Sequence, residues 1–355
     1  MPAREPGVFV RPIVTSMHGY VPGEQPRDRS YIKLNTNENP YPPSPRVVEA
    51  IKAAVNEDLR LYPDPLASGL RERASVVYGV RPENVLVGNG SDELLSLLVR
   101  ACVNGGDRVV YPYPTYSLYD TLVTIQEGVA VHVPYPDDFS LPSGLAEGRG
   151  RLTLVCNPNS PSGTPVAVET LRSLARAVSG ILVVDEAYVD FAETTALPLV
   201  HECDNVVVLR TFSKSFSLAG LRIGLAFGPA AIIDELLKVK DSYNVTRLSI
   251  VAAIAALEDY AWMEDNVARI RRTRQRLTEH LRDLAFAVLP SQSNFVLARR
   301  PGRSLAGVYA DLKARGILVR YFAVAELRDA LRISVGSDAE IDALLAALRD
   351  MAAPA

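Results

Sequence analysis

Lysine, cysteine, histidine and tryptophan are all scarce in this sequence. Its 355 residues include six lysines, three cysteines, four histidines and one tryptophan. Three cysteines cannot all pair with one another, and none belongs to a C-x-x-C motif, which argues against a disulfide framework. Because Cys102, Cys156 and Cys203 each lie in or beside an apolar stretch, we interpret them as reduced core residues of a cytoplasmic protein.

The sequence also lacks the patterns of a metal site, a nucleic-acid binder and a membrane protein. The histidines are dispersed and none has the ligand spacing of a zinc site. The formal net charge is −3 and no block of like charges occurs, which argues against nucleic-acid and polybasic membrane binding. There is no run of about 18 apolar residues, and no signal-peptide core at the start. We expect a cytoplasmic protein that acts on small molecules without a metal.

What the sequence does contain is the alternation of an α/β protein. Continuous apolar runs of four to six residues are separated by helix-length segments. This pattern is typical of strands buried on both faces of a mostly parallel sheet. The runs occupy 85–88, 107–111, 129–133, 151–156, 181–185, 205–210 and 222–227. They predict an α/β fold with a mostly parallel sheet flanked by helices.

The composition and the alternation of apolar runs with helix-length segments both change before and after the predicted sheet region. Residues 1–44 are rich in proline, asparagine and glycine, which indicates an arm packed over the body. Segment 247–284 has the pattern of one long helix and is followed by the strand-like "SNFVLA", "GILVRYF" and "ALRISVG" and a final helix. We predict an N-terminal arm over 1–44 that forms part of the small domain, a large α/β domain over 45–245, and a small α+β domain over 246–355.

Polar side chains gather where the predicted strands end. In an open α/β sheet, ligands bind beyond the carboxyl ends of the strands. Asp185 ends one apolar run, "NPNSPSG" follows another, and "GNGS" at 88–91 leads into a helix. Glycines followed by a serine at a helix start leave backbone N–H groups free for an anion. Each motif alone also fits an ordinary turn or helix cap, but together they indicate one binding site.

Lys214 lies in the most informative of these segments, "RTFSKSFSLAGLRIG". A lysine with apolar neighbours and a nearby cation, here Arg222, has a lowered amine pKa and becomes a nucleophile for a carbonyl group. Arg222 and the hydroxyls of Thr211 and Ser213 are suited to bind a phosphate at the same point. With Asp185 as the partner of a pyridinium nitrogen, these groups predict a pyridoxal 5′-phosphate site.

The sequence resembles the fold-type I pyridoxal-phosphate-dependent aminotransferases. "GNGSDELL", "YPTYSLY", "NPNSPSGT", "DEAYVDF" and "RTFSKSFSLAGLRIG" occur in the order of that family. "GYVPGEQP", "KLNTNENPYPPSP", "LYPDP", "DSYNV", "SNFVLA", "GILVR" and "LRISVG" are similar to the branch that acts on histidinol phosphate. The resemblance covers nearly the whole chain. It implies a seven-stranded sheet and places the cofactor in the large domain.

The resemblance assigns the chemistry to a few residues. It implies that Lys214 bonds covalently to the cofactor and then moves a proton as general acid and base. Asp185 is implied to keep the ring nitrogen protonated, and Tyr188 to hydrogen-bond the phenolic oxygen of the ring. Tyr116 is implied to stack on the ring face.

The resemblance further implies a phosphate-binding set and a contact between subunits. The remaining cofactor-binding residues of the set are Gly90, Ser91, Asp92, Ser213 and Arg222. Tyr62 of "LYPDP" would reach the phosphate in the other subunit, which makes the active enzyme a homodimer. One departure concerns Ser160-Pro161-Ser162-Gly163, where many relatives read N-P-T-G. Asn157 is the nearest substitute for the asparagine that normally contacts the phenolic oxygen.

Two anion sites are implied for the substrates. Arg332 would hold the α-carboxylate of glutamate as a bidentate pair, and Arg320 would hold the far phosphate of histidinol phosphate. Tyr20 and Asn37 belong to arm segments that would close over the pocket. The implied reaction interconverts L-histidinol phosphate and 2-oxoglutarate with imidazole-acetol phosphate and L-glutamate in histidine biosynthesis.

Three alternatives stay open at this stage. Within the same fold they are transamination of aromatic amino acids and decarboxylation of threonine phosphate, because phosphate and carboxylate are bound by similar cations. The third is a pyridoxal-binding regulator without turnover. Such regulators usually carry an added DNA-binding segment, whereas this chain starts directly with the arm, so we expect an enzyme.

Overall fold

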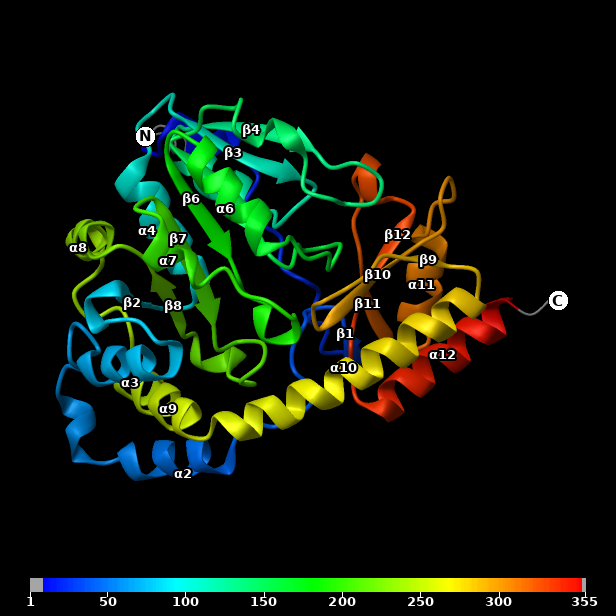
Figure 1. Cartoon of the computed structure of the whole chain (residues 1–355). Coiled ribbons are helices and arrows are strands. Elements are labelled where there is room, and N and C mark those ends of the chain that lie inside the picture. The colour runs from blue at the N-terminus through cyan, green and yellow to red at the C-terminus, as the bar shows by residue number, and fades with distance from the viewer. Residues whose placement is uncertain (1–8, 353–355) are drawn as a thin grey trace, which may run out of the picture.

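A computed structural model describes residues 9–352, and its larger sheet has the seven predicted strands (Figure 1). Their order is β2 (Val85–Gly88), β8 (Gly224–Phe227), β7 (Val206–Thr211), β6 (Ile181–Asp185), β5 (Leu152–Cys156), β3 (Arg108–Tyr113) and β4 (Val129–Pro134). β8 runs antiparallel to both of its neighbours, and the other pairs are parallel. The apolar runs therefore located every strand to within one or two residues.

Helices cover both faces of the inner strands of this sheet, which are apolar for that reason. The edge strand β4 is exposed or half-buried along its length, so the prediction that the run 129–133 is buried on both faces was wrong. In β7, Val206 and Val208 pack into one core cluster, whereas Val207 and Leu209 pack into a second. The first cluster takes in α3 (Ser68–Tyr78), α6 (Val168–Ala177), α7 (Leu199–Glu202) and α9 (Arg247–Glu258). The second takes in α4 (Ser91–Cys102), α5 (Leu118–Ile125) and α8 (Ala230–Val239). Side chains of a strand alternate between faces, so each cluster takes every second residue.

A second, smaller sheet has five strands. Their order is β1 (Ile32–Leu34), β11 (Ile317–Tyr321), β12 (Ala330–Ser334), β10 (Phe295–Arg299) and β9 (Ala287–Val288). β1 pairs in parallel with β11, so the N-terminal segment is built into this sheet. A separate core cluster lies between the sheet and the C-terminal helix α12 (Asp338–Ala352), with α11 (Ala306–Ala314) beside it.

The predicted single helix over 247–284 is two helices. α9 ends at Glu258, and α10 (Tyr260–Asp283), the long yellow helix in Figure 1, begins directly after Asp259. Asp259 has φ −115° and ψ 48°, outside the helical region. Its carboxylate accepts a hydrogen bond from the Ser44 hydroxyl, and Ser44 is the N-cap of α2 (Pro45–Ala54). This bond between two side chains joins segments 215 residues apart. The Asp259 backbone N–H still donates to the Ala255 carbonyl, so the helical hydrogen bonds of α9 continue up to Asp259.

The arm has little regular structure. A short helix, α1 (Pro12–Ser16), is followed by irregular chain up to β1. Arg11 of the arm forms an exposed ion pair with Glu127 of the large domain's surface. None of the helices within residues 9–352 has the length and apolar character needed to cross a membrane.

Candidate active site

The carboxyl ends of the parallel strands open into a cavity of about 430 Å³ between the two sheets. Asp185 at the end of β6 and Lys214 after β7 line it from the large sheet. Arg320 of β11 and Arg332 of β12 line it from the small one, and Tyr20 lies at its edge in the arm. The structure thus brings together residues that lie more than 300 positions apart in the sequence.

Lys214 is half-buried and lines this cavity, and its amine has a lowered pKa. Its Nζ donates to the backbone oxygen of Thr36 at 3.4 Å and lies 5.8 Å from the ring centre of Tyr188. Burial lowers the pKa of Lys214 to about 8, and the positive charge of Arg332 adds to this effect. Removing an ammonium group from water disfavours its charged form. The amine is therefore able to lose its proton near neutral pH, as a nucleophile or a general base requires.

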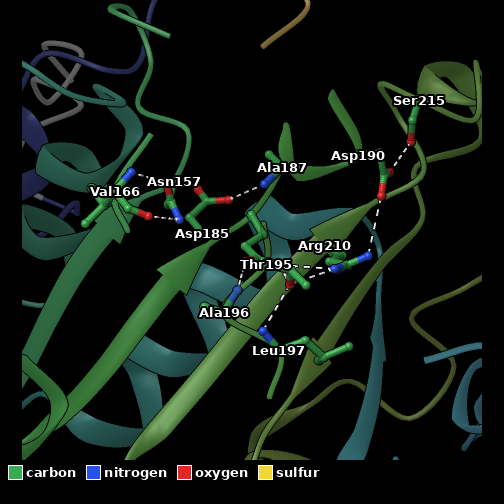
Figure 2. Close-up of polar contacts among 11 residues, drawn as sticks. Asn157, Val166, Asp185, Ala187, Asp190, Thr195, Ala196, Leu197, Arg210 and Ser215 are labelled. Carbon is green, nitrogen blue, oxygen red and sulfur yellow. Dashed lines mark hydrogen bonds and ion pairs between the residues drawn. The ribbon is translucent and has the colours of Figure 1, made fainter. Parts of the chain in front are cut away.

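Asp185 is a buried carboxylate without a cation bonded to it within residues 9–352. It is 3% exposed, and one of its oxygens accepts a hydrogen bond from the Tyr119 hydroxyl at 2.9 Å. The other accepts from the Ala187 backbone N–H at 3.2 Å (Figure 2). Burial raises the pKa of Asp185 to about 6. A buried carboxylate in this state gains from a protonated nitrogen placed beside it. The ring nitrogen of pyridoxal phosphate fits that requirement.

The start of α4 forms an anion cradle. Gly90 has φ +82°, and an added Cβ there would lie 2.7 Å from Nη2 of Arg222. Nη1 of Arg222 donates to the Ser213 hydroxyl at 3.3 Å, while Nη2 pairs with the Asp92 carboxylate at 3.1 Å. Ser91 is the first residue of the helix, so its neighbouring N–H groups point along the helix axis into the cavity. Free N–H groups, two hydroxyls and a guanidinium suit the phosphate of the cofactor.

Two aromatic residues frame the space between the lysine and the cradle. The Tyr116 hydroxyl donates to Asp92 at 3.1 Å, and its ring packs edge-on against Tyr20 with a centroid distance of 5.9 Å. Tyr188 is buried, and its hydroxyl accepts a hydrogen bond from the side-chain amide of Asn37 at 3.0 Å. Burial raises the pKa of Tyr188 to about 12, although the charge of Arg332 and the Asn37 hydrogen bond oppose the rise.

Arg320 and Arg332 are directly opposite each other on β11 and β12. Opposite residues of an antiparallel pair share a face, so two cations project to the same side of the sheet. Arg332 donates to the Ser160 hydroxyl at 3.2 Å and to the backbone oxygen of Asn35 at 2.9 Å. Burial lowers the pKa of Arg332, and the charge of Arg320 also acts in that direction. A pair of like charges in one cavity favours a ligand that carries negative charge.

Three residues of the predicted set do not line the cavity. Gly90 lies directly behind it, against Arg222. Tyr62 is 77% exposed and stacks on Tyr243 with a centroid distance of 4.4 Å. The side chain of Asn157 accepts from the Val166 N–H at 2.8 Å and donates to the Val166 oxygen at 3.3 Å, so it faces the loop after β5 (Figure 2). Ser160, which bonds Arg332, lines the cavity instead.

Sequence reasoning missed the residues that hold the catalytic loops. Arg210 of β7 is 8% exposed and lies 3.3 Å from the Glu186 carboxylate and 3.4 Å from that of Asp190. Asp190 in turn accepts a hydrogen bond from the Ser215 hydroxyl (Figure 2). This cluster ties the loop after Asp185 to the residue that follows Lys214. The charges in "DEAYVD" and "LR" were a signal, because charges in such apolar surroundings need partners.

Tyr119 was also missed as a partner of Asp185. It follows Tyr116 by three positions, and its hydroxyl is buried against the carboxylate. Tyr116 lies just before α5, and its ring packs edge-on against that of Tyr119 with a centroid distance of 5.7 Å. The second tyrosine of "TYSLY" was therefore a usable signal for another aromatic group in the site.

Comparison with known proteins places the chain in a family. The family model of class I and II aminotransferases matches residues 29–348. The chain is 47% identical over 345 residues to histidinol-phosphate aminotransferase 1 of Trichormus variabilis, covering 97% of this chain and 99% of the relative. It is 48% identical over 338 residues to histidinol-phosphate aminotransferase of Rhodopirellula baltica, covering 94% and 93%.

Solved structures agree with this placement. Histidinol-phosphate aminotransferase from Sinorhizobium meliloti, in complex with pyridoxal-5′-phosphate, superposes with a TM-score of 0.88 at 30% identity, covering 97% of each chain. A Thermus thermophilus aspartate aminotransferase double mutant shares the fold, with a TM-score of 0.82 at 23% identity over 97% of this chain and 98% of that one. The chain therefore belongs to the class I and II aminotransferases, with their fold-type I architecture, and within them to the histidinol-phosphate aminotransferases. Fold-type I aminotransferases depend on pyridoxal phosphate.

Proposed function

We propose that this protein transfers an amino group between L-histidinol phosphate and 2-oxoglutarate, with imidazole-acetol phosphate and L-glutamate as the products. This is a step of histidine biosynthesis. The observation that carries the proposal is the pair of arginines, Arg320 and Arg332, directly opposite each other in the cavity that also holds Lys214. Two cations near one reactive amine suit substrates with an anionic group at one or both ends.

Bound pyridoxal phosphate would supply an electron sink for negative charge at the substrate Cα. Lys214 would bind it covalently, and Asp185 would face its ring nitrogen. Because the pKa of Lys214 is close to 8, its Nζ can accept and return a proton near neutral pH. Ser91, Ser213 and Arg222 would hold the phosphate, which keeps the ring fixed while the lysine moves the proton.

The two arginines have different tasks in this proposal. Arg332 would bind the α-carboxylate of glutamate, a group that histidinol phosphate lacks. Arg320 would bind the phosphate of histidinol phosphate. In the structure its guanidinium donates to the backbone oxygens of Val21 at 3.1 Å and Pro22 at 3.3 Å, which uses two of its five N–H groups. A substrate phosphate would bind the remaining N–H groups or displace these carbonyls. A charge-assisted bond to phosphate is stronger than a bond to a neutral carbonyl.

The test compares Arg320→Gln with Arg332→Gln in both half-reactions. A hydrogen bond to a charged group contributes roughly 1.5 to 3 kcal/mol, so Arg320→Gln is expected to lower kcat/KM for histidinol phosphate by about 10- to 100-fold. The half-reaction with glutamate should fall less, because its distal carboxylate uses Arg320 only in part. Arg332→Gln should mainly impair glutamate. Single-turnover absorbance changes of the bound cofactor measure each half-reaction separately.

Equal losses for both substrates in Arg320→Gln would remove the case for histidinol phosphate. Faster turnover of phenylalanine or tyrosine than of histidinol phosphate by the unmodified enzyme would assign the protein to the aromatic aminotransferases. Release of carbon dioxide from threonine phosphate would assign it to the decarboxylases of the same fold.

We further propose that the active enzyme is a homodimer in the cytoplasm. Segment 55–66 has five exposed large apolar side chains, and one of them, Tyr62, stacks on the exposed Tyr243; the five are Val55, Leu59, Leu61, Tyr62 and Leu66. Tyr62 would cross to the cofactor phosphate of the partner. This accounts for a tyrosine that is exposed in the single chain and does not line its own cavity.

We also propose the division into an arm over 1–44, a large domain over 45–245 and a small domain over 246–355. Two separate sheets and separate core clusters support it. The pairing of β1 with β11 supports the assignment of part of the arm to the small domain.

A further inference from the structure

Each polar atom of Asn37 has a hydrogen-bond partner within the protein, although the residue lines the cavity. It is 1% exposed, and its backbone N–H donates to the Ser334 hydroxyl oxygen at 2.9 Å. Its backbone oxygen accepts from the side-chain amide of Asn294 at 2.9 Å. Its side-chain amide donates to the Tyr188 hydroxyl at 3.0 Å, and its side-chain oxygen accepts from the Ser334 hydroxyl at 2.8 Å. Asn37 thus lies between Ser334 at the end of β12 and Tyr188 after β6.

The directions of these hydrogen bonds follow from a count of protons. A backbone N–H can only donate, so the Ser334 oxygen must accept from Asn37. The single proton of the Ser334 hydroxyl then needs an acceptor, and within residues 9–352 its other partner is the Asn37 side chain. The reverse orientation of the amide would leave that proton buried without an acceptor, which costs free energy. The side-chain oxygen of Asn37 therefore faces Ser334, and its NH₂ group faces Tyr188.

This orientation of the Asn37 amide makes the Tyr188 hydroxyl an acceptor toward Asn37 and leaves its proton free to be donated elsewhere. Its oxygen accepts from Asn37, and no acceptor for its own proton is found among residues 9–352. Tyr188 lines the cavity together with Lys214 and Arg332. Its proton is thus left for an acceptor inside the cavity.

We propose that Ser334 and Asn37 are positioning residues that make the Tyr188 hydroxyl a fixed hydrogen-bond donor toward the phenolic oxygen of the bound cofactor. This rests on the proposed function, because it requires pyridoxal phosphate in the cavity. The backbone of Asn37 adds a second constraint, since its φ of 56° is left-handed. Asparagine tolerates that region better than most residues with a side chain. The same position thus needs both an amide donor and a left-handed backbone.

The test is a spectroscopic pH titration of the cofactor-loaded enzyme. A donor to the phenolic oxygen stabilises its negative charge, so losing the donor should raise the pH midpoint at which the visible absorption band changes. Tyr188→Phe should raise this midpoint by about one to two pH units. Ser334→Ala should raise it by a smaller amount, because the amide of Asn37 is then free to rotate. Asn37→Asp replaces the donor by an acceptor and should shift it at least as far as Tyr188→Phe.

We call the hydrogen bonds from Ser334 to Asn37 and from Asn37 to Tyr188 the relay. A double-mutant cycle separates a shift transmitted through the relay from a shift that Ser334→Ala causes by another route. The shift caused by Ser334→Ala should disappear in the Tyr188→Phe background, where the relay has no target. Ser293→Ala is the matched control, because Ser293 is also a buried serine near the small sheet, but its hydroxyl has no partner within residues 9–352. It should leave the midpoint unchanged.

A Ser334→Ala shift that persists in the Tyr188→Phe background would overturn the relay, as would unchanged midpoints in both Ser334→Ala and Asn37→Asp. The titration needs no substrate, so it is independent of substrate identity. An enzyme that shows the expected shifts but does not turn over histidinol phosphate would support the relay and refute the proposed substrate. A protein that takes up no pyridoxal phosphate would refute the proposed function and the relay with it.

Discussion

The buried amine of Lys214 makes the stability of the cofactor-free protein depend on pH. Burial lowers its pKa from 10.5 to about 8, so between these values the unfolded chain binds a proton that the folded chain does not. Stability rises with pH wherever the unfolded state binds more protons. The unfavourable contribution of Lys214 is therefore fully present below pH 8 and is relieved as the pH rises toward 10.5.

We expect Lys214→Met to remove this pH dependence. Relative to the variant, the unmodified cofactor-free protein should gain about 3 kcal/mol of unfolding free energy between pH 7 and pH 10.5. Urea unfolding of both proteins across this range measures the difference, in which the titration of other groups cancels. Parallel curves for the two proteins would show that Lys214 keeps an ordinary proton affinity in the fold.

At the residue scale, the ends of the apolar runs located two residues that line the cavity. Asp185 is the last residue of β6 and Lys214 follows β7 by three positions, and both strands were recognisable as apolar runs. Asn157 also follows a strand, but its side chain bonds Val166 within its own loop. The relay from Ser334 to Tyr188 had no signal of this kind, since it depends on how three distant segments meet.

At the element scale, the anion cradle at the start of α4 depends on the close approach of β8 to that helix. A Cβ at Gly224 would lie 2.6 Å from the Gly90 carbonyl carbon and 2.6 Å from the Ser91 backbone nitrogen. Both neighbours are backbone atoms, so the helix start itself would have to move. Only glycine lets the strand pass at this distance.

Gly224→Ala should therefore weaken cofactor binding. Overpacking of this kind costs about 1 to 3 kcal/mol, which corresponds to a loss of affinity for pyridoxal phosphate of roughly tenfold or more. Equilibrium dialysis of the cofactor-free protein measures it. Gly307→Ala is the control, because a Cβ at Gly307 meets nothing within 4 Å. Equal affinities in Gly224→Ala and the unmodified protein would show that the cradle does not rely on this contact.

The elements that the sequence located poorly are those shaped by distant contacts. The strands were predictable because burial on both faces leaves a local apolar signal. The break between α9 and α10 was not, because it lies where Asp259 contacts Ser44, which is 215 residues away in the sequence. The buried Arg210 cluster is another such case, since its carboxylates come from a different loop.

At the scale of the whole molecule, the exposed position of Tyr62 predicts a site shared between two chains. Mixing inactive Lys214→Ala with weakened Tyr62→Phe should restore activity. A hybrid dimer of this mixture contains one site with an intact lysine from one chain and an intact tyrosine from the other. Random pairing would restore about a quarter of the sites to the unmodified composition.

Native mass spectrometry monitors the subunit exchange, and the specific activity of the mixture is measured once the exchange is complete. If exchange is complete and the activity is no higher than that of the Tyr62→Phe component, each site belongs to a single chain.

The resting partners of Arg320 are two main-chain oxygens, those of Val21 and Pro22. Replacing the side chains at these positions leaves both carbonyls in place, so alanine scanning of the arm would not detect the interaction. What holds the guanidinium is the path of the chain, and only a change in the length of the arm alters that path. Inserting or deleting a single residue between 21 and β1 is therefore the type of change to which this part of the site is sensitive, and variation among natural relatives should preserve spacing here more strictly than residue type.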